Sequence, residues 1–208
     1  MTLQSIRAWF HSVFTGTALS EPTILKQSAH RYTFSVPGMS KARYRVCHIR
    51  NLPEFYAYEA SLQTLASPDD AQRLNCHPKA MPWLLSSRLM THLPYLWVVI
   101  DKDDQVVSTA SLHKVENQTA SYVGFNQLTG NPDVGILLGA ITAISYGFEV
   151  MKLKTIQAEF TAEATEVNRF CTILGFEKQM SAIPLITYSL DAPVYLTFLK
   201  GTDHDTWP

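Results

Sequence analysis

The stretch YLWVVIDKDDQVVSTASLHKVENQTASYVGF, residues 95–125, decides the fold. Its apolar segments at 95–100, 105–115 and 120–125 are rich in β-branched and aromatic residues, a composition that favours strands. Two short polar segments separate them, DKDD at 101–104 and a second turn around Asn117. Because strands joined by such short turns pair side by side, the stretch predicts an antiparallel meander.

The periodicity changes after the meander. Apolar residues recur at helical spacing from there on, at Leu137, Ala140, Ile141, Ile144 and Phe148. A strand is predicted at 154–160 (KTIQAEF), and an amphipathic helix in 164–176 (ATEVNRFCTILGF) that stops at Gly175. Further strands are predicted at 176–180 and at 193–200 (PVYLTFLK). This order predicts an α+β fold, in which helices flank a mixed central sheet that contains the meander.

The segment before the meander completes the main domain, which we place at residues 41–208. ARYRVCHI, at 42–49, alternates like a strand. A helix is predicted at 53–66 with Pro53 at its start, a second one after Ser67, and a third near 83–90. Helices are therefore expected between the first strand of this domain and the meander.

Residues 1–40 are predicted to form an N-terminal extension. An amphipathic helix is expected around Trp9 and Phe10, followed by a linker at 17–37 with one strand, HRYTFSV. The apolar face of this helix is suited to packing against the domain or against a second subunit. A homodimer joined through it is compatible with every function considered below.

Charge and composition exclude several classes of protein. A net charge of -1 and a pI near 6.6 provide no overall basic field for nucleic acid. No apolar stretch approaches the roughly 20 residues that cross a bilayer, so no membrane partner is expected. Cys47, Cys76 and Cys171 share no close spacing and suggest neither disulfides nor a metal site. These features favour a soluble cytoplasmic protein.

Two segments carry a family resemblance. TIQAEFTAEATEVNRFCTILGF, residues 155–176, ends in Leu-Gly-Phe after a strand and a helix, and ASYVGFNQLTGNPDVGILLGAI, residues 120–141, joins a strand to a helix through a loop. With these two segments and this order of strands and helices, residues 43–200 resemble the GNAT family, the Gcn5-related N-acetyltransferases. They resemble in particular the bacterial members that act on protein N-termini or amino sugars. The resemblance implies a GNAT fold, acetyl-CoA as co-substrate, and a small-molecule or protein amine as acceptor.

The resemblance also implies a cofactor site. The backbone of Phe125, Asn126 and Gln127 would pair with pantetheine, and Asn168 would reach the same group. The amides of Asp133, Val134, Gly135 and Ile136 would receive the pyrophosphate, because a helix start leaves N–H groups unpaired and favours an anion. Only Gly135 matches the small-residue pattern of the family's phosphate loop. The alternative for Gly135 is that it merely permits a tight turn.

Catalysis by this family requires a proton donor and a proton acceptor. Cys171 stands four residues before Gly175, where many members have a donor tyrosine, so it is the candidate donor; the alternative is a small core residue. Glu116 is the candidate base; the alternative is that it only solvates a turn. His113 and Glu159 are read more simply as a surface histidine and a solvated charge. A base that acts through water, or an amine that arrives neutral, stays open.

The function expected from these residues is direct transfer of an acetyl group from acetyl-CoA to a primary amine. The alternative is a catalytically inactive GNAT-fold module that binds or regulates. The eroded phosphate loop and the missing tyrosine would explain that alternative equally well.

Overall fold

The computed structural model describes residues 23–28, 31–35, 43–66, 77–126, 132–161, 171, 174–179 and 185–195. The predicted N-terminal helix, the helix expected after Ser67 and most of the helix at 164–176 lie outside these residues.

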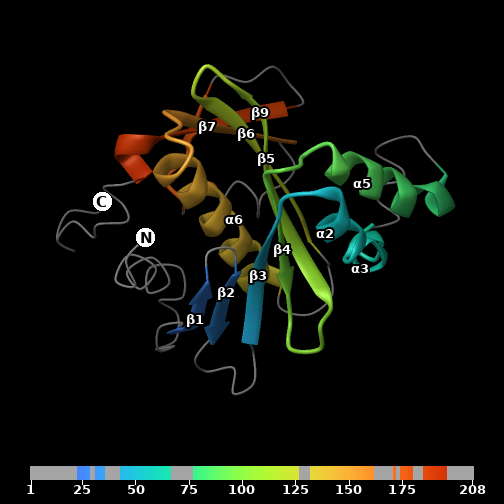
Figure 1. Cartoon of the computed structure of the whole chain (residues 1–208). Coiled ribbons are helices and arrows are strands. Elements are labelled where there is room, and N and C mark those ends of the chain that lie inside the picture. Colours follow the sequence, from blue (N-terminus) through green and yellow to red (C-terminus); the bar gives the residue numbers. More distant parts are fainter. Residues whose placement is uncertain are drawn as a thin grey trace.

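The described strands form a single mixed sheet (Figure 1). Their order across it is β1-β2-β3-β4-β5-β6-β7-β9-β8. Every neighbouring pair is antiparallel except β6 and β7, which run parallel. The strands are β1 (Thr23–Ser28), β2 (Arg31–Ser35), β3 (Arg43–Ile49), β4 (Leu96–Ile100), β5 (Val106–Glu116), β6 (Thr119–Asn126), β7 (Thr155–Thr161), β8 (Glu177–Lys178) and β9 (Leu185–Asp191).

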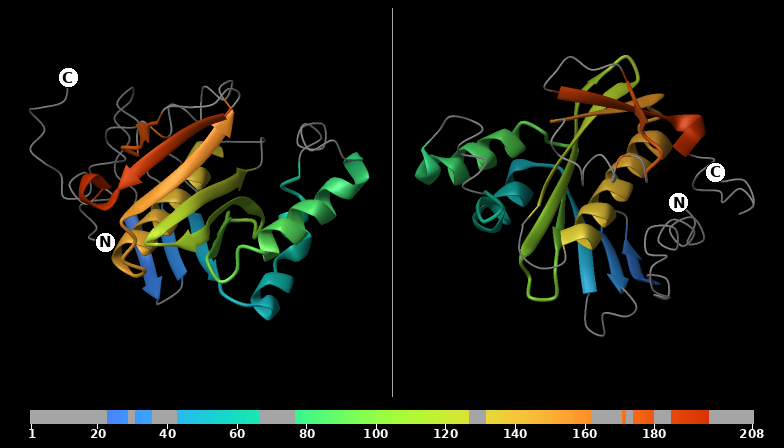
Figure 2. Two further views of the ribbon diagram at one scale, coloured as in Figure 1. Left: turned by 90° about the horizontal axis from the view of Figure 1, so that it is seen from above. Right: turned by 180° about the vertical axis from the view of Figure 1, so that it is seen from behind.

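Helices cover both faces of the sheet. Figures 1 and 2 show α6 on one face and α2, α3 and α5 on the other. Their bounds are α2 (Leu52–Tyr56), α3 (Glu59–Gln63), α5 (Met81–Met90) and α6 (Pro132–Glu149), and a 3₁₀ turn, η1 (Pro78–Ala80), precedes α5. The predicted meander, the strand before it and the helices at 83–90 and 137–148 are thus confirmed. The helix predicted at 53–66 is divided in two.

The central strand β4 contributes to a separate core on each face. Trp97 and Val99 pack with α6, whereas Val98 and Ile100 pack with α2, α3 and α5. Side chains of successive strand residues point to opposite faces, so a strand covered on both sides is apolar throughout. All of β4 is buried, which explains why the sequence LWVVI shows no polar alternation.

Three glycines let α6 lie close to the sheet. Gly135, Gly139 and Gly147 are spaced so that they share one face of the helix. A Cβ added at Gly139 would lie 3.1 Å from Val99 Cγ2, and one at Gly147 would lie 3.0 Å from the Cδ1 atoms of Ile156 and Leu112. The spacing between helix and sheet therefore depends on the missing side chains.

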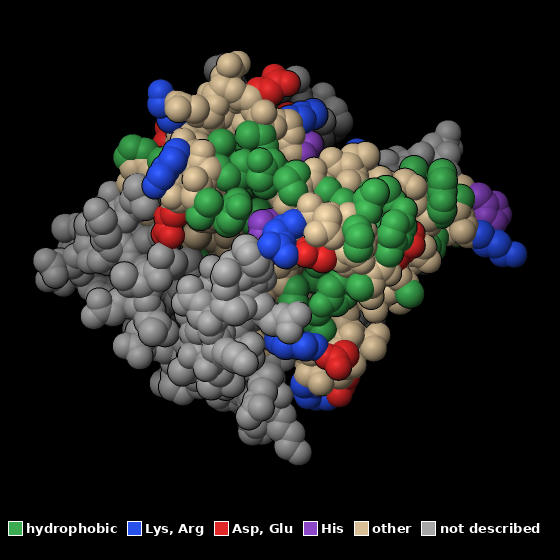
Figure 3. Space-filling model, in the orientation of Figure 1, with side chains coloured by type: hydrophobic (Ala, Val, Ile, Leu, Met, Phe, Trp, Pro, Cys, Tyr) green, Lys and Arg blue, Asp and Glu red, His purple; other side chains and the backbone are tan. Residues whose placement is uncertain are grey.

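Hydrophobic side chains also reach the surface over the helices of the α5 face (Figure 3). Leu52 and Tyr56 of α2 are exposed, and Trp83 of α5 is 67% exposed. Trp83 was expected to open an apolar helix, but it points away from the core that Leu85 and Leu89 enter. No helix in the described part of the chain has the length and apolar character required to cross a bilayer.

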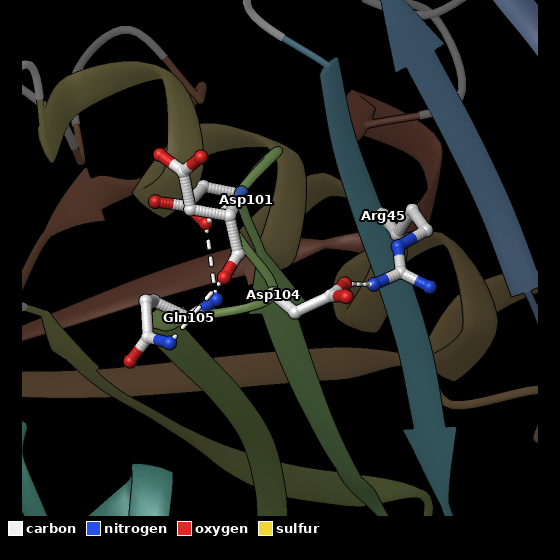
Figure 4. Close-up of polar contacts among 5 residues, drawn as sticks. Arg45, Asp101, Asp104 and Gln105 are labelled. Carbon is white, nitrogen blue, oxygen red and sulfur yellow. Dashed lines mark hydrogen bonds and ion pairs between the residues drawn. The ribbon is translucent and has the colours of Figure 1, made fainter.

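The hairpin between β4 and β5 is closed by its acidic turn (Figure 4). The Asp101 carboxylate accepts hydrogen bonds from the backbone N–H groups of Asp103, at 2.8 Å, and Gln105, at 3.0 Å. Arg45, on the adjacent strand β3, forms an ion pair with Asp104 at the tip. An aspartate that caps its own turn in this way is a local sequence signal, and the turn predicted at 101–104 is confirmed.

Two predictions near the chain ends are corrected. The stretch 17–37, expected to be a linker with one strand, contains β1 and β2, and β2 pairs with β3 as part of the sheet. The last described strand is β9 rather than a strand beginning at 193, because residues 192–195 are helical. Asp191 followed by Ala192 and Pro193 suits a helix start, since aspartate favours the N-cap and proline the first turn.

Candidate functional site

The parallel strands β6 and β7 pair over only part of their length. They pair from Thr119 with Thr155 to Tyr122 with Ala158. Beyond this point, residues 123–126 pair only with β5, and residues 159–161 pair only with β9. We call these two unpaired ends the β6–β7 splay. Backbone groups of the splay that point toward the missing neighbour need another partner, which makes this part of the sheet a candidate binding site.

The splay carries the first predicted cofactor residues. Phe125 and Asn126 pair with Thr109 and Ser108 of β5 and have no partner on β7. They are placed where an extended ligand could add to the edge of β6. Gln127 and Asn168 lie outside the described residues.

Helix α6 follows the splay and begins at Pro132. The N–H groups of a first helical turn have no intrahelical partner, and proline has no N–H. The amides available for an anion in this turn are therefore those of Asp133 and Val134, because the N–H of Gly135, the fourth helical residue, makes the first i→i−4 bond of the helix. Ile136 lies four residues after Pro132, so its N–H donates within the helix and is not free for a phosphate.

Gly135 faces the sheet. It is buried, and a Cβ added there would lie 3.2 Å from Val107 Cγ2 and 3.8 Å from Ser108 Cβ. The position without a side chain is thus occupied by β5 rather than open to a ligand. The close packing of α6 on β5 accounts for this glycine.

Cys171 lies in the core near the splay. Its side chain is fully buried, and burial raises the pKa of its thiol to about 12. The Cys171 carbonyl accepts a hydrogen bond from the Phe176 N–H at 2.9 Å, and Gly175 has φ +80°. Glycine takes this left-handed conformation at little cost, so the helix stop predicted at Gly175 is confirmed. The thiol packs as a small apolar group, as the core interpretation expects.

Tyr122 is a functional candidate that the sequence reasoning missed. It belongs to the last residue pair between β6 and β7, and its side chain is 4% exposed. Burial, and then the nearby Cys171, raise the pKa of its phenol. Among the described residues, its hydroxyl has no hydrogen-bond partner. A protonated phenol without a partner is available to donate to a ligand.

Gly124 leaves room for this phenol at the splay. A Cβ added at Gly124 would lie 2.8 Å from the Tyr122 hydroxyl oxygen and 3.1 Å from the Thr109 carbonyl oxygen. The hydroxyl therefore lies over an exposed glycine of the splay. An aromatic residue followed two positions later by glycine, as in Tyr-Val-Gly, was the sequence signal for this arrangement, because both positions share one face of a strand.

The opposite face of the sheet holds a polar cluster. His92, which follows α5, is buried and its Nδ1 lies 2.8 Å from Ser111 Oγ on β5. Ser111 Oγ also donates to the Val123 carbonyl at 3.1 Å. The His92 ring stacks on His113, with a centroid separation of 4.9 Å and an interplanar angle of 20°. Burial lowers the pKa of His92 to about 4, with smaller contributions from His113 and Arg88.

We expect His92 to make the protein sensitive to acid. The folded pKa lies below the unfolded value, so the unfolded state binds more protons as the pH falls from 6.5 to 4. Through this residue, the free energy of unfolding should decrease by about 2 kcal/mol across that window. Urea unfolding of the wild type and His92→Gln at pH 7 and pH 4.5 measures the effect. An equal loss of stability in both proteins would contradict it.

The predicted base Glu116 lies at the other end of β6. It is exposed, pairs with Thr119 and adjoins the tight turn at Asn117 and Gln118, both of which have positive φ. Because β6 is paired to β7 from Thr119 onward, the structure does not bring Glu116 to the splay. Glu159, in contrast, is the first β7 residue beyond the last pair, and it is exposed. Among the described residues, no group of acidic, histidine and cysteine side chains is arranged for a metal ion.

Comparisons with known proteins address the fold. No protein-family model matches the chain, and a search of curated proteins finds no match. Solved structures do match. The chain is similar to a GNAT-family acetyltransferase from Bacillus anthracis, with 18% identity and a TM-score of 0.55 over 72% of this chain and 95% of that one.

Two further solved structures agree with the first. One is the ribosomal-protein-S5-alanine acetyltransferase of Vibrio fischeri, with 15% identity and a TM-score of 0.53 over 73% of this chain and 94% of that one. The other is a mutant spermidine/spermine N-acetyltransferase of Vibrio cholerae, with 10% identity and a TM-score of 0.54 over 76% of this chain and 98% of that one. The resemblance seen in the sequence is therefore confirmed in three dimensions, and the chain has the fold of the GNAT N-acetyltransferases.

Proposed function

We propose that this protein is an N-acetyltransferase, which transfers an acetyl group from acetyl-CoA to a primary amine. The observation that carries the proposal is the β6–β7 splay, from which β6 leads toward the N-terminus of α6. The splay supplies unpaired backbone groups for an extended acyl-pantetheine, and the helix start supplies amides and a positive dipole end for its pyrophosphate. Acetyl-CoA contains both groups.

The residues proposed to hold acetyl-CoA follow from this arrangement. The backbone of Phe125 and Asn126 is proposed to pair with pantetheine. Gln127 and Asn168, which lie outside the described residues, stay predicted members of this site. The pyrophosphate is held by the first-turn amides of Asp133 and Val134, and Gly135, whose amide donates within α6, packs the helix on β5. Ile136, whose amide donates within α6, contributes to the helix rather than to the phosphate.

The proposed reaction is a direct transfer. The amine nitrogen forms a bond to the thioester carbonyl carbon, the carbon–sulfur bond breaks, the amine loses a proton, and the CoA thiolate gains one. The phenol of Tyr122 donates a hydrogen bond to the sulfur as negative charge develops on it. Cys171 packs in the same core cluster as Tyr122, and its side chain is fully buried. Donors directed at developing charge are effective when, like this phenol, they are already in place.

The acceptor is proposed to be a primary amine on a small molecule or a protein. Two of the similar structures are a ribosomal-protein-S5-alanine acetyltransferase and a spermidine/spermine N-acetyltransferase, whose acceptors share an aliphatic amino group. Catalysis in the cytoplasm is part of the proposal, since Cys47 and Cys171 are free thiols.

Acetyl-CoA should raise the melting temperature of the protein. A ligand that binds only the folded state adds about 2.7 kcal/mol of stability at a concentration 100 times its Kd. Calorimetric titration with acetyl-CoA, with free adenosine as the control ligand, checks the binding. An absence of heat and of thermal shift at millimolar acetyl-CoA would contradict the proposal.

The alternative function is a GNAT-fold module that binds acetyl-CoA without turnover. The burial of Gly135 against β5 favours it, because the single matching residue of the phosphate loop is explained by packing alone. Release of CoA thiol in the presence of spermidine, glucosamine and a peptide with an N-terminal alanine separates the two functions. Binding without thiol release from any of these amines would favour the module.

A further inference from the structure

The cluster of His92, Ser111 and His113 borders the splay on the face that carries α5. Ser111 is opposite Val123, the first β6 residue beyond the last β6–β7 pair, and His113 is opposite Ser121, the residue just before that pair. Leu96, the register partner of Ser111 on β4, belongs to the core beneath α5. Tyr122, in contrast, belongs to the core on the α6 face. The histidines and the phenol therefore flank the start of the splay from opposite faces of the sheet.

The hydrogen bonds of the cluster define the state of His92. The Val123 carbonyl can only accept, so the Ser111 hydroxyl donates its one hydrogen to it. His92 must then donate from Nδ1 to Ser111 Oγ, which assigns the neutral Nδ1–H tautomer from its partners. Burial keeps His92 neutral by holding its pKa at about 4. A neutral ring can stack on a neighbour that carries a positive charge without repelling it.

His113 is the accessible member of this stack. Its side chain is partly exposed, and among the described residues its ring forms no hydrogen bond. Burial lowers the pKa of His113, with further lowering by Lys114 and Arg88, whereas Glu159 on β7 raises it. The imidazole is thus neutral at pH 7, and the Glu159 carboxylate is near enough to stabilise it after it takes a proton. These are the properties of a general base.

We propose that the acceptor amine approaches the splay from the α5 face and that His113 takes the proton it loses. The amine nitrogen forms its bond to the acetyl carbon, its proton passes to the unprotonated ring nitrogen of His113, and the electrons of the broken carbon–sulfur bond leave with the thiolate. Solvent then removes the proton from the exposed imidazolium. His92 is a positioning residue, which holds the His113 ring by stacking. This inference rests on the proposed acetyltransferase function and names its base and its acceptor face.

The test compares the pH dependence of two variants. For the amine that gives the fastest thiol release, kcat/KM is measured between about pH 5 and 8 and divided by the fraction of neutral amine. The wild type should lose activity toward low pH as His113 becomes protonated. His113→Gln, which cannot take the proton, should lose this acid limb and be slower by about 10²-fold at pH 7.5. Calorimetry should give an unchanged Kd for acetyl-CoA, because the ring does not hold the cofactor.

His77→Gln is the matched control. His77 is an exposed histidine that precedes η1, at the opposite end of α5 from His92. The His77→Gln variant should keep the wild-type rate and pH profile. An active protein in which His113→Gln retains the wild-type rate and acid limb would overturn the base while leaving the proposed function intact. A wild type that binds acetyl-CoA but acetylates none of the amines would overturn the proposed function, and the base with it.

Discussion

Replacing Tyr122 with phenylalanine should lower kcat by about 10²- to 10³-fold while leaving acetyl-CoA affinity almost unchanged. The ring would stay in the core of the α6 face, and only the hydroxyl that lies over Gly124 would be lost. In the proposed reaction that hydroxyl interacts with the sulfur only as charge develops, so its loss should affect turnover rather than binding. Steady-state thiol release and calorimetry on the same preparation measure the two quantities.

Three companion variants make this result specific. Cys171→Ala should keep turnover near the wild-type value, because the buried thiol has a packing role. Tyr195→Phe also removes a buried phenol hydroxyl, one that lies 2.9 Å from Ser145 Oγ in the C-terminal half of α6, and should leave kcat unchanged. Gly124→Ala should displace the Tyr122 hydroxyl and therefore reproduce much of the decrease in kcat expected for Tyr122→Phe. Full turnover in Tyr122→Phe together with a loss in Cys171→Ala would reverse the assignment in favour of the thiol.

Gly139→Leu should destabilise the protein by about 2 to 3 kcal/mol, which corresponds to roughly 5 to 10 °C in Tm. Its Cβ would lie 3.1 Å from Val99 Cγ2 and 3.3 Å from Ala110 Cβ, so the rest of the side chain would force α6 away from the sheet. Leucine gains about 1 kcal/mol of helix propensity over glycine, which offsets only part of this cost. Urea unfolding followed by circular dichroism measures the change.

A double-mutant cycle tests the cause. Val99→Ala removes the methyl groups nearest the new side chain, so Gly139→Leu should cost less in that background than in the wild type. Gly139→Ala adds only one carbon at the same contact distances and should be much closer to neutral. Additive costs in the cycle would show that the loss does not arise from the contact between α6 and β4.

Local patterns in the sequence were sufficient for most of the framework. The apolar strands of the meander, the Asp101 turn, the helical repeat of α6 and the stop at Gly175 were predicted correctly, because each depends on residues close together in the chain. Strand β9 was missed, although Ile186, Tyr188 and Leu190 alternate inward along it. The segments 185–191 and 193–200 are similarly apolar in the sequence. The pairing with β7 is what identifies 185–191 as a strand of the sheet.

The candidate site, too, was predicted from the sequence only in part. The sequence of residues 120–141 was enough to predict strand β6 and helix α6, to whose ends we assign acetyl-CoA, since a helix start after a strand exposes amides wherever it occurs. Sequence could not show that Gly135 faces β5, that Ile136 donates within the helix, or that Glu116 lies at the paired end of β6. Each depends on how a helix or strand is oriented and paired in the folded protein, where its partners are distant in the chain.

The sequence by itself therefore determined the order of the elements and their turns, because backbone preferences and apolar periodicity act over a few residues. Its resemblance to the GNAT family indicated which fold this order belongs to. Only the tertiary structure decided the candidate chemistry. It placed the Tyr122 hydroxyl over Gly124 in the core cluster that also buries Cys171, and it stacked His92 on His113 from elements separated along the chain. Burial and through-space contacts change what a hydroxyl, a thiol or an imidazole can do, and neither is defined until the sheet has closed and the helices have packed on it.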